Sequence, residues 1–214
     1  MLSKNLNMNF RFYSKYLLHF FESEKFPIIK IRGKEFIFIH INKNAGTSIL
    51  TSFNKKKFHL TVVELNELLG ERTLKKCIKF AIIRNPYDRV VSFYKHRVKT
   101  NQSNLMSENI DLNKWVELTF SENYNGKYRD KKRMFLTQLK WLKDENGVLL
   151  VDEILRFDNL TSDFNEFCLK YSLNAKLPHS NRSDFVESDA LSDFSKNLIY
   201  NYYEEDFLYF NFDK

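Results

Sequence analysis

Two short apolar runs constrain the fold more than any other feature of this sequence. Residues 37–41 and 79–83 are almost continuously apolar and rich in β-branched and aromatic side chains. Strands that are buried on both faces have this pattern, and such strands form parallel sheets covered by helices. Helix signals follow both runs, and further helices are expected near residues 131–142, 163–171 and 195–204. We therefore predict an α/β fold of three layers, with a central parallel β-sheet flanked by helices.

The domain organisation is expected to be simple. A chain of 214 residues without internal repeats or low-complexity linkers is most simply one domain. We assign residues 31–214 to this domain and residues 1–30 to an N-terminal extension. The turn signal at 144–148 should lead into one bent strand or two short strands within 148–157. In the extension, the aromatic and basic segment 10–21 either packs on the domain or lies on a membrane surface.

Charge and cysteine content limit the partners and the compartment. The formal net charge of +7 favours anionic partners and leaves nucleic acid, acidic membranes, nucleotides and sulfated or carboxylated glycans open. Cys77 and Cys168 are too few for a disulfide framework, and we expect both to be buried free thiols. The sequence has neither a long apolar run nor a signal peptide. We therefore expect a cytoplasmic protein, with peripheral membrane contact through the extension as the alternative.

The first polar loop, in "HINKNAGTS", has the composition of an anion site. A strand ending at Ile41 and a helix starting near Thr47 would direct the backbone N–H groups of Gly46, Thr47 and Ser48 at one point. Lys43 adds a mobile positive charge. The P-loop pattern G-x-x-x-x-G-K-[ST] is absent, however. The alternative is an ordinary strand-to-helix turn with a capping hydroxyl.

The second loop, in "RNPYDRVVSFY", predicts a helix start. Asn85 is a suitable N-cap, Pro86 fits the first helical position, and Asp88 lies three residues after the cap. Arg84 then ends the preceding strand, and Ser92 lies on the new helix. These two side chains could hold a second anion from two sides. Alternatively, Arg84 forms a salt bridge and Ser92 is a solvated helix residue.

The two loops together resemble a known family. "FIHINKNAGTSI" and "FAIIRNPYDRVVSFY" closely resemble the two nucleotide-binding motifs of carbohydrate sulfotransferases, the family of heparan sulfate 2-O- and HNK-1-type enzymes. "HLTVVELNELLG", "VDEILRFDNLTSDF", "LPHSNRS" and "YYEEDFLYFNF" follow in the order of that family, so the resemblance covers about residues 35–212. It implies a P-loop-like fold and an enzyme that transfers a sulfuryl group from 3′-phosphoadenosine 5′-phosphosulfate (PAPS) to a carbohydrate hydroxyl. Because the sulfuryl group carries little net charge, we expect no metal.

The resemblance also implies roles for individual residues. Lys43 is expected near the bridging oxygen of the donor, and the 3′-phosphate should be bound by Arg84 and Ser92. The loop that binds the 5′-phosphosulfate is formed by Lys43, Asn44, Ala45, Gly46, Thr47 and Ser48.

Two further parts of the family pattern are less regular here. Asn181 and Ser183 match a late segment that lies near the nucleotide in the family, and a surface loop is the alternative. The family usually has Pro and Thr where this chain has Asn42 and Asn44. We expect this difference to make the loop geometry looser without removing binding.

Histidine is the expected general base, because its pKa lies near neutrality. His59 precedes a predicted helix and matches a histidine near the reaction centre in the resembling family, while Lys43 would stabilise the leaving oxygen. His40 and then Glu64 are the alternatives. The basic runs 55–57 and 131–133 are either solvated faces or contacts for an anionic glycan acceptor.

Two other functions remain open. A nucleotide kinase of related architecture would require the missing P-loop lysine and an aspartate that holds magnesium. A non-catalytic module that binds nucleic acid or another anion would not require Lys43, Arg84 and Ser92 together. We therefore expect a carbohydrate partner and no nucleic acid, while the sequence leaves the oligomeric state open.

Overall fold

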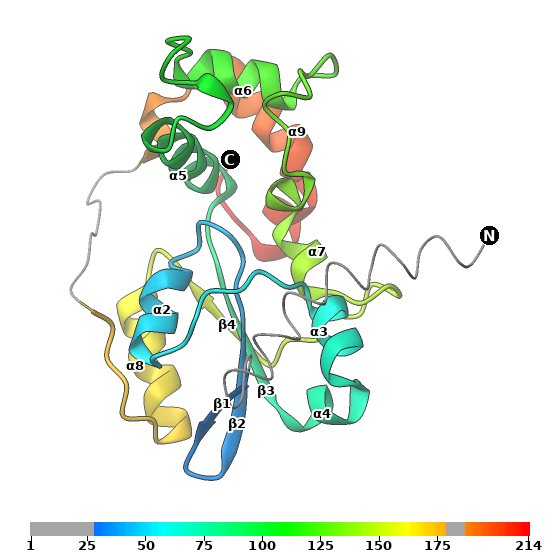
Figure 1. Cartoon of the computed structure of the whole chain (residues 1–214), viewed down its shortest axis with the longest axis vertical. Coiled ribbons are helices and arrows are strands. Elements are labelled where there is room, and N and C mark those ends of the chain that lie inside the picture. Colours follow the sequence, from blue (N-terminus) through cyan, green and yellow to red (C-terminus); the bar gives the residue numbers. More distant parts are fainter. Residues whose placement is uncertain (1–27, 179–186) are drawn as a thin grey trace.

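The computed structural model describes residues 28–178 and 187–214 and contains a four-stranded sheet (Figure 1). The strands lie in the order β1 (Ile28–Ile31), β2 (Lys34–Ile39), β3 (Ile78–Ile83) and β4 (Glu153–Arg156). Strands β2, β3 and β4 are parallel, whereas β1 pairs antiparallel with β2. The predicted α/β fold with a central, largely parallel sheet is confirmed.

The strand positions differ from the sequence predictions in several details. β2 begins three residues before the run 37–41, and β3 begins one residue before the run 79–83. The boundary drawn between residues 30 and 31 falls inside β1. β2 ends two residues before the predicted run does, because the amide of Ile41 turns back to the carbonyl of Ile39 at 3.1 Å. Of the residues 148–157, only Glu153–Arg156 form a strand, while Leu149 makes an isolated bridge to Lys143.

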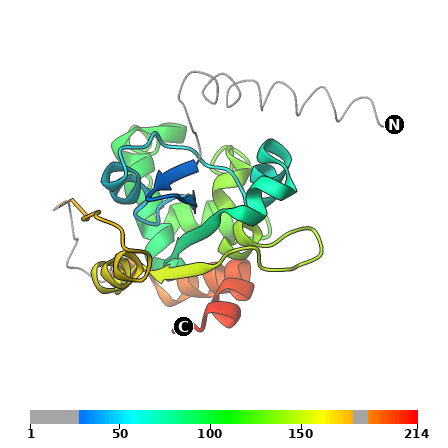
Figure 2. The same cartoon turned by 90° about the horizontal axis from the view of Figure 1, so that it is seen from below.

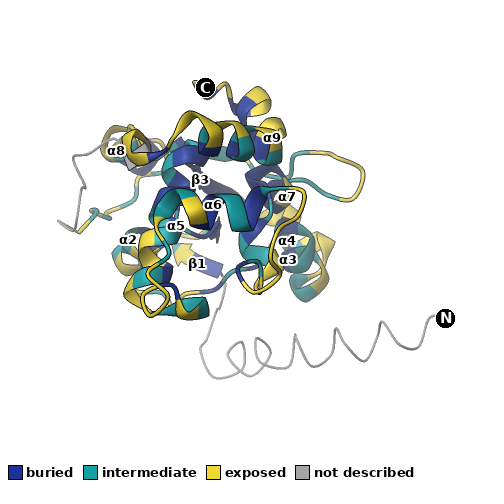
Figure 3. Cartoon of the chain, turned by 90° about the horizontal axis from the view of Figure 1, so that it is seen from above, coloured by how far each residue is buried: buried dark blue, intermediate teal, exposed yellow. Residues whose placement is uncertain are grey.

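Helices cover both faces of the sheet, as Figures 1 and 2 show. One face carries α2 (Gly46–Ser52) and α8 (Leu160–Tyr171), and the other carries α3 (Val62–Leu69) and α4 (Glu71–Lys76). Aromatic rings fill the space beneath α8, where Phe167 lies 4.6 Å from Phe80 and 6.0 Å from Phe36 between ring centroids. Buried residues accordingly gather on the sheet and on the inner sides of the helices (Figure 3).

The remaining helices lie beyond the carboxyl ends of the parallel strands (Figure 1). They are α5 (Pro86–Lys99), α6 (Leu112–Phe120), α7 (Gln138–Leu142) and α9 (Asp193–Phe210), with short 3₁₀ turns at Gln102–Asn104, Lys132–Phe135 and Glu187–Ala190. α9 packs against both α5 and α6. Among the helices in the described ranges, none is long and apolar enough to cross a membrane.

The helix predictions are confirmed in type and corrected at one position. α5 begins as expected, with the Asn85 side chain accepting a hydrogen bond from the Tyr87 amide at 2.9 Å. The stretches 163–171 and 195–204 fall inside α8 and α9. The single helix expected over 131–142 is wrong, because Leu136 has an extended backbone (ψ 144°) that separates a 3₁₀ turn from α7.

Candidate active site

The first loop, residues 40–45, joins β2 to α2 through two backbone positions in the left-handed region. Lys43 has φ 69° and Ala45 has φ 54°, a conformation that costs about 1–2 kcal/mol for each residue with a Cβ. Asn44, between them, is fully buried and donates to the carbonyl of Ile82 at 2.7 Å and to Oε1 of Gln138 at 2.6 Å. These buried hydrogen bonds hold the loop in its strained path, as occurs at functional sites.

Asn42 fixes the start of the same loop. Its Nδ2 donates to the carbonyl of Met134 at 3.1 Å, and its Oδ1 accepts from Nη2 of Arg89 at 2.8 Å. Both Asn42 and Asn44 are therefore buried cross-links between the loop and its surroundings. The expectation that these two residues loosen the loop is wrong.

The start of α2 brings backbone amides to the end of the first loop. Gly46 begins the helix, and the ring of His40 lies so close that a Cβ on Gly46 would be 1.9 Å from Nε2 of His40. The amide of Ser48 donates to the carbonyl of Ala45 at 3.0 Å. The amide of Ser48 is therefore used inside the protein, and the expectation that it is one of three converging backbone donors is wrong.

The second loop, residues 84–85, lies against the first. Nη1 of Arg84 donates to the carbonyl of Lys43 at 3.2 Å, and its guanidinium carbon lies 4.0 Å from the ring centroid of Phe157. The stacking fixes the plane of the guanidinium group. Ser92 is half-buried on α5, the helix that the second loop starts. The structure therefore brings together the two loops that the sequence singled out separately.

His59 is held next to the first loop by His40. The two imidazole centroids are 4.0 Å apart, and Nδ1 of His59 lies 3.0 Å from the carbonyl oxygen of His40. Because a carbonyl can only accept, Nδ1 of His59 carries the proton and Nε2 keeps its lone pair. Burial lowers the pKa of His59 from 6.5, and the nearby charges of Arg133 and Lys57 lower it further. Burial, with a smaller contribution from His59, lowers the pKa of His40 to about 3.

Glu64, the third candidate base, is occupied by structural contacts. Its carboxylate accepts from the amide of Thr61 at 2.8 Å in a capping box that starts α3. It also forms an ion pair with Arg133, which donates in addition to the carbonyl of His59 at 2.9 Å. Glu64 thus supports the segment that carries His59.

Two of the predicted site residues cannot be placed. Asn181 and Ser183 lie outside the described residues. Within the described ranges, no three His, Cys, Asp or Glu side chains gather as a metal site would require.

Comparison with known proteins identifies the family. A family model described as the sulfotransferase family matches residues 29–213, which include both loops, His59, strands β2, β3 and β4, and all of β1 except its first residue. The chain belongs to the sulfotransferase family. Searches among curated proteins and among solved structures gave no match. Membership supports a transferase enzyme and sulfuryl transfer in general.

Three buried polar residues of this sulfotransferase were not singled out from the sequence. Arg89 donates to Asn42 and to the carbonyl of Leu136 at 3.0 Å. Gln138 contacts both loops, and Asp206 accepts from the amide of Gln138 at 2.7 Å. Arg89 lies within the quoted motif of the second loop, which is the only signal that could have pointed to it.

Asp206 gives the sulfotransferase a pH-dependent stability. Burial raises the pKa of this carboxyl group from 3.8 to about 6, against the opposing effects of two backbone amides and Arg89. Between pH 4 and pH 6 the unfolded chain therefore releases this proton before the folded protein does, so the contribution of Asp206 to stability falls as the pH rises.

Asp206→Asn removes this titration. We expect the free energy of unfolding of the variant, relative to the wild type, to rise by on the order of 3 kcal/mol between pH 4 and pH 7. Any loss from the altered hydrogen bonds is independent of pH and leaves this slope unchanged. Urea unfolding of both proteins across the range measures it, and parallel stability curves would contradict the assignment.

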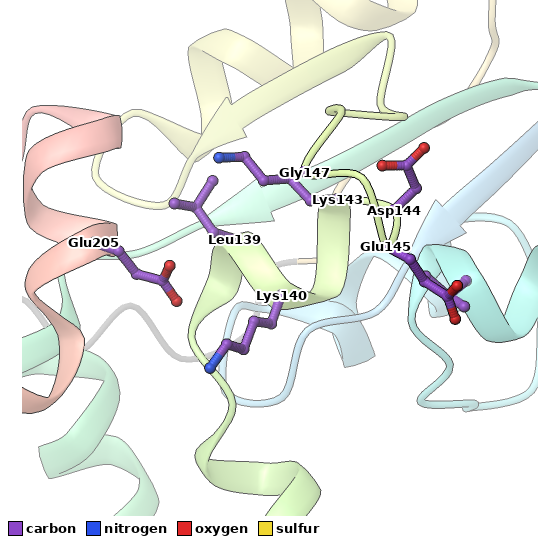
Figure 4. Close-up of a pocket in the computed structure, with 8 residues that line it drawn as sticks. Leu139, Lys140, Lys143, Asp144, Glu145, Gly147 and Glu205 are labelled. Atoms are coloured by element: carbon purple, nitrogen blue, oxygen red, sulfur yellow. The ribbon is translucent and has the colours of Figure 1, made fainter.

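A hollow in the sulfotransferase lies against α7. It has a volume of about 310 Å³ and is lined by Lys140, Lys143, Asp144, Glu145 and Glu205, among other residues (Figure 4). Neither loop contributes a side chain to it, and its three carboxylates outnumber its two ammonium groups. Its excess of negative charge does not suit an anionic donor, whereas the two loops carry Lys43 and Arg84.

Proposed function

We propose that this sulfotransferase moves a sulfuryl group from PAPS to a hydroxyl group of a carbohydrate. The observation that carries the proposal is the hydrogen bond between the guanidinium of Arg84 and the carbonyl of Lys43. It joins the two loops that resemble the two phosphate-binding motifs of the family, at the edge of the sheet where ligands of parallel α/β folds bind.

The donor would lie across both loops. We assign its 5′-phosphosulfate to Lys43 and to the residues at the start of α2, namely Gly46, Thr47 and Ser48. Arg84 and Ser92 would bind the 3′-phosphate, because a guanidinium group suits bidentate contact with phosphate oxygens. Asn181 and Ser183 remain further proposed contacts to the nucleotide.

His59 is the proposed base in this reaction. As its Nε2 takes the proton of the acceptor hydroxyl, the acceptor oxygen forms a bond to sulfur, and the bond from sulfur to the bridging oxygen breaks. Adenosine 3′,5′-bisphosphate leaves with the bonding electrons, and Lys43 would stabilise the charge on the departing oxygen. His40 is less suited because its pKa is about 3, and Glu64 because Arg133 and a capping box hold it.

Positive charge near the first loop supports an anionic acceptor. Burial lowers the pKa of His96, and the positive charges of Lys43, Lys131, Lys57 and Lys99 lower it further, so the surface around His96 on α5 has a positive potential. Carboxylate or sulfate groups of a glycan would be attracted to this surface. The basic runs 55–57 and 131–133 each contribute one of these lysines.

Thermal unfolding with nucleotides tests the donor assignment. A ligand at 100 times its dissociation constant adds about 2.7 kcal/mol, which corresponds to roughly 5–10 °C in a domain of this size. We expect this shift with adenosine 3′,5′-bisphosphate and a much smaller one with ATP and magnesium. Equal shifts, or a larger one with ATP, would favour a nucleotide kinase instead.

Lys43→Ala tests the first loop directly. Loss of one charge-assisted hydrogen bond should weaken binding of adenosine 3′,5′-bisphosphate about 10- to 100-fold. Lys132→Ala is the matched control, because Lys132 is also a lysine but is exposed on a 3₁₀ turn. Titration calorimetry measures both, and similar affinities for the two variants would remove Lys43 from the donor site.

A further inference from the structure

The side chain of Gln138 connects the two loops. Its Oε1 accepts from Nδ2 of Asn44 at 2.6 Å and from the amide of Arg84 at 2.9 Å. Its Nε2 donates to the carbonyl of Arg84 at 2.8 Å. The two backbone partners fix the orientation of the amide, since only the oxygen can accept from an N–H and only the nitrogen can donate to a carbonyl. One primary amide thus satisfies groups from both loops.

The position of Gln138 is itself fixed by its neighbours. The side chain is fully buried and belongs to the first turn of α7. Asp206 on α9 accepts from the amides of Gln138 at 2.7 Å and Leu139 at 2.9 Å. The side chain of Thr137 caps the same helix. A residue tied down in this way can transmit the position of α9 to the loops but has little freedom to move.

The spacing of the two loops therefore depends on Gln138. Asn44 lies between Lys43 and Ala45, the two left-handed residues of the first loop. Its hydrogen bond to Gln138 therefore fixes the backbone position of the neighbouring Lys43. The two hydrogen bonds between Gln138 and the backbone of Arg84 fix the backbone position from which the Arg84 side chain extends. The direct hydrogen bond from Arg84 to the carbonyl of Lys43 is longer, at 3.2 Å, than the three hydrogen bonds that Gln138 makes to the loops.

We propose that Gln138 is a positioning residue that sets the distance between the two phosphate sites of the donor. This inference rests on the proposed function, because it assigns one phosphate to each loop. A ligand with both phosphates then needs the correct spacing, whereas a ligand with one phosphate can follow a displaced loop. Gln138 acts on the loops and makes no contact with the ligand.

The replacement Gln138→Met tests the proposal, because methionine keeps the length of the side chain and removes all three hydrogen bonds. We expect it to weaken binding of adenosine 3′,5′-bisphosphate at least tenfold more than the product of its effects on adenosine 5′-monophosphate and adenosine 3′-monophosphate. Calorimetry measures the bisphosphate, and ligand-observed NMR measures the weaker monophosphates. A residue that only stabilised the fold would weaken all three ligands without this excess.

Leu142→Val provides the matched control. Leu142 is also fully buried on α7, but its apolar side chain cannot hydrogen-bond to either loop. This variant should lose stability without a specific loss for the bisphosphate. If Gln138→Met does not fold, Gln138→Glu replaces it, since a carboxylate keeps the two acceptor bonds and loses the donor to Arg84. The excess loss should then be smaller but still specific for the bisphosphate.

The outcomes separate this inference from the proposed function. If the wild-type protein does not prefer adenosine 3′,5′-bisphosphate to ATP with magnesium, the donor assignment fails. A second case is that the wild type prefers the bisphosphate while the folded Gln138 variant loses affinity for it only by the product of its losses for the two monophosphates. In that case Gln138 supports each loop separately, and the inference is overturned. An equal excess in Leu142→Val would overturn it as well.

Discussion

Gly46→Ala should destabilise the protein by about 3 kcal/mol, and most of this loss should disappear when His40 is also replaced by alanine. The new Cβ would lie 1.9 Å from both Nε2 and Cδ2 of His40. Contacts this short require one group to move. The effect is expected to be among the largest of any single methyl group in the chain.

The ring of His40 is tightly packed and cannot move away from Gly46 without displacing its neighbours. Only 4% of the residue is exposed, and its centroid lies 5.6 Å from that of Phe38 and 4.0 Å from that of His59. Displacing it would disturb the carbonyl that holds Nδ1 of His59. The strain therefore falls on the first loop, and binding of adenosine 3′,5′-bisphosphate should weaken together with stability.

The double variant separates the collision from backbone effects. Gly46 lies in a helix and is not among the residues with positive φ, so alanine fits its backbone. In the His40→Ala background, Gly46→Ala should therefore be neutral or stabilising by up to about 1 kcal/mol. Urea unfolding of the wild type, the two single variants and the double variant measures the coupling.

Gly126→Ala is the control for this cycle, because nothing lies within 4 Å of a Cβ built at Gly126. Its replacement should change the free energy of unfolding by less than about 0.5 kcal/mol in either background. If the effects of Gly46→Ala and His40→Ala on the free energy of unfolding are additive, the ring of His40 is not the reason that position 46 requires glycine.

The sheet was predictable from the sequence wherever a strand is buried on both faces. The apolar runs of β2 and β3 carry this pattern because helices cover both sides. β1 has buried residues only in its first half, and its first three residues were assigned to the extension. A short edge strand needs few apolar side chains, so its pattern is weak.

The break before α7 was not predictable for a different reason. Leu136 is extended, yet neither Gly nor Pro occurs between residues 131 and 142 to indicate an interruption. The structure explains it by tertiary contacts, since Arg89 binds the carbonyl of Leu136 and Asp206 caps α7. Local propensity is overridden by groups distant in sequence.

The two loops of the candidate site were predictable from the sequence, but the buried residues that hold the loops in place were not. Lys43 and Arg84 occur in local patterns that a sequence displays directly. Gln138 lies 54 residues from Arg84 and 94 from Asn44. Two of its three bonds go to backbone atoms, which every residue has, so no pairing of side-chain types reveals it. The burial of Asn42 and Asn44 escaped prediction for the same reason.

His59→Ala should lower turnover by about 10²- to 10⁴-fold while leaving the affinity for adenosine 3′,5′-bisphosphate within about threefold of the wild type. The expected split follows from the assigned roles, because the base acts on the acceptor and does not hold the nucleotide. Turnover is measured as sulfate added to a glycan fraction that the wild-type enzyme modifies, by mass spectrometry at saturating donor. Near-normal turnover in the variant would transfer the role to another group.

Two controls distinguish a lost base from a disturbed loop. His96→Ala removes an exposed histidine of α5 and should leave turnover at saturating acceptor nearly unchanged. Added imidazole should restore part of the activity of His59→Ala, because it can occupy the space of the missing ring and accept the proton. Failure of rescue together with weakened nucleotide binding would indicate a structural role for His59.

The pH profile of the wild type gives an independent check on the same residue. Burial and the charges of Arg133 and Lys57 hold the pKa of His59 below 6.5, so its Nε2 stays unprotonated at neutral pH. Turnover should therefore persist as the pH falls to 6.5 and decline only at lower values. Arg133→Gln removes one of these charges, so the acidic limb should move to higher pH. A limb that stays in place, or moves to lower pH, would show that a group other than His59 controls the reaction.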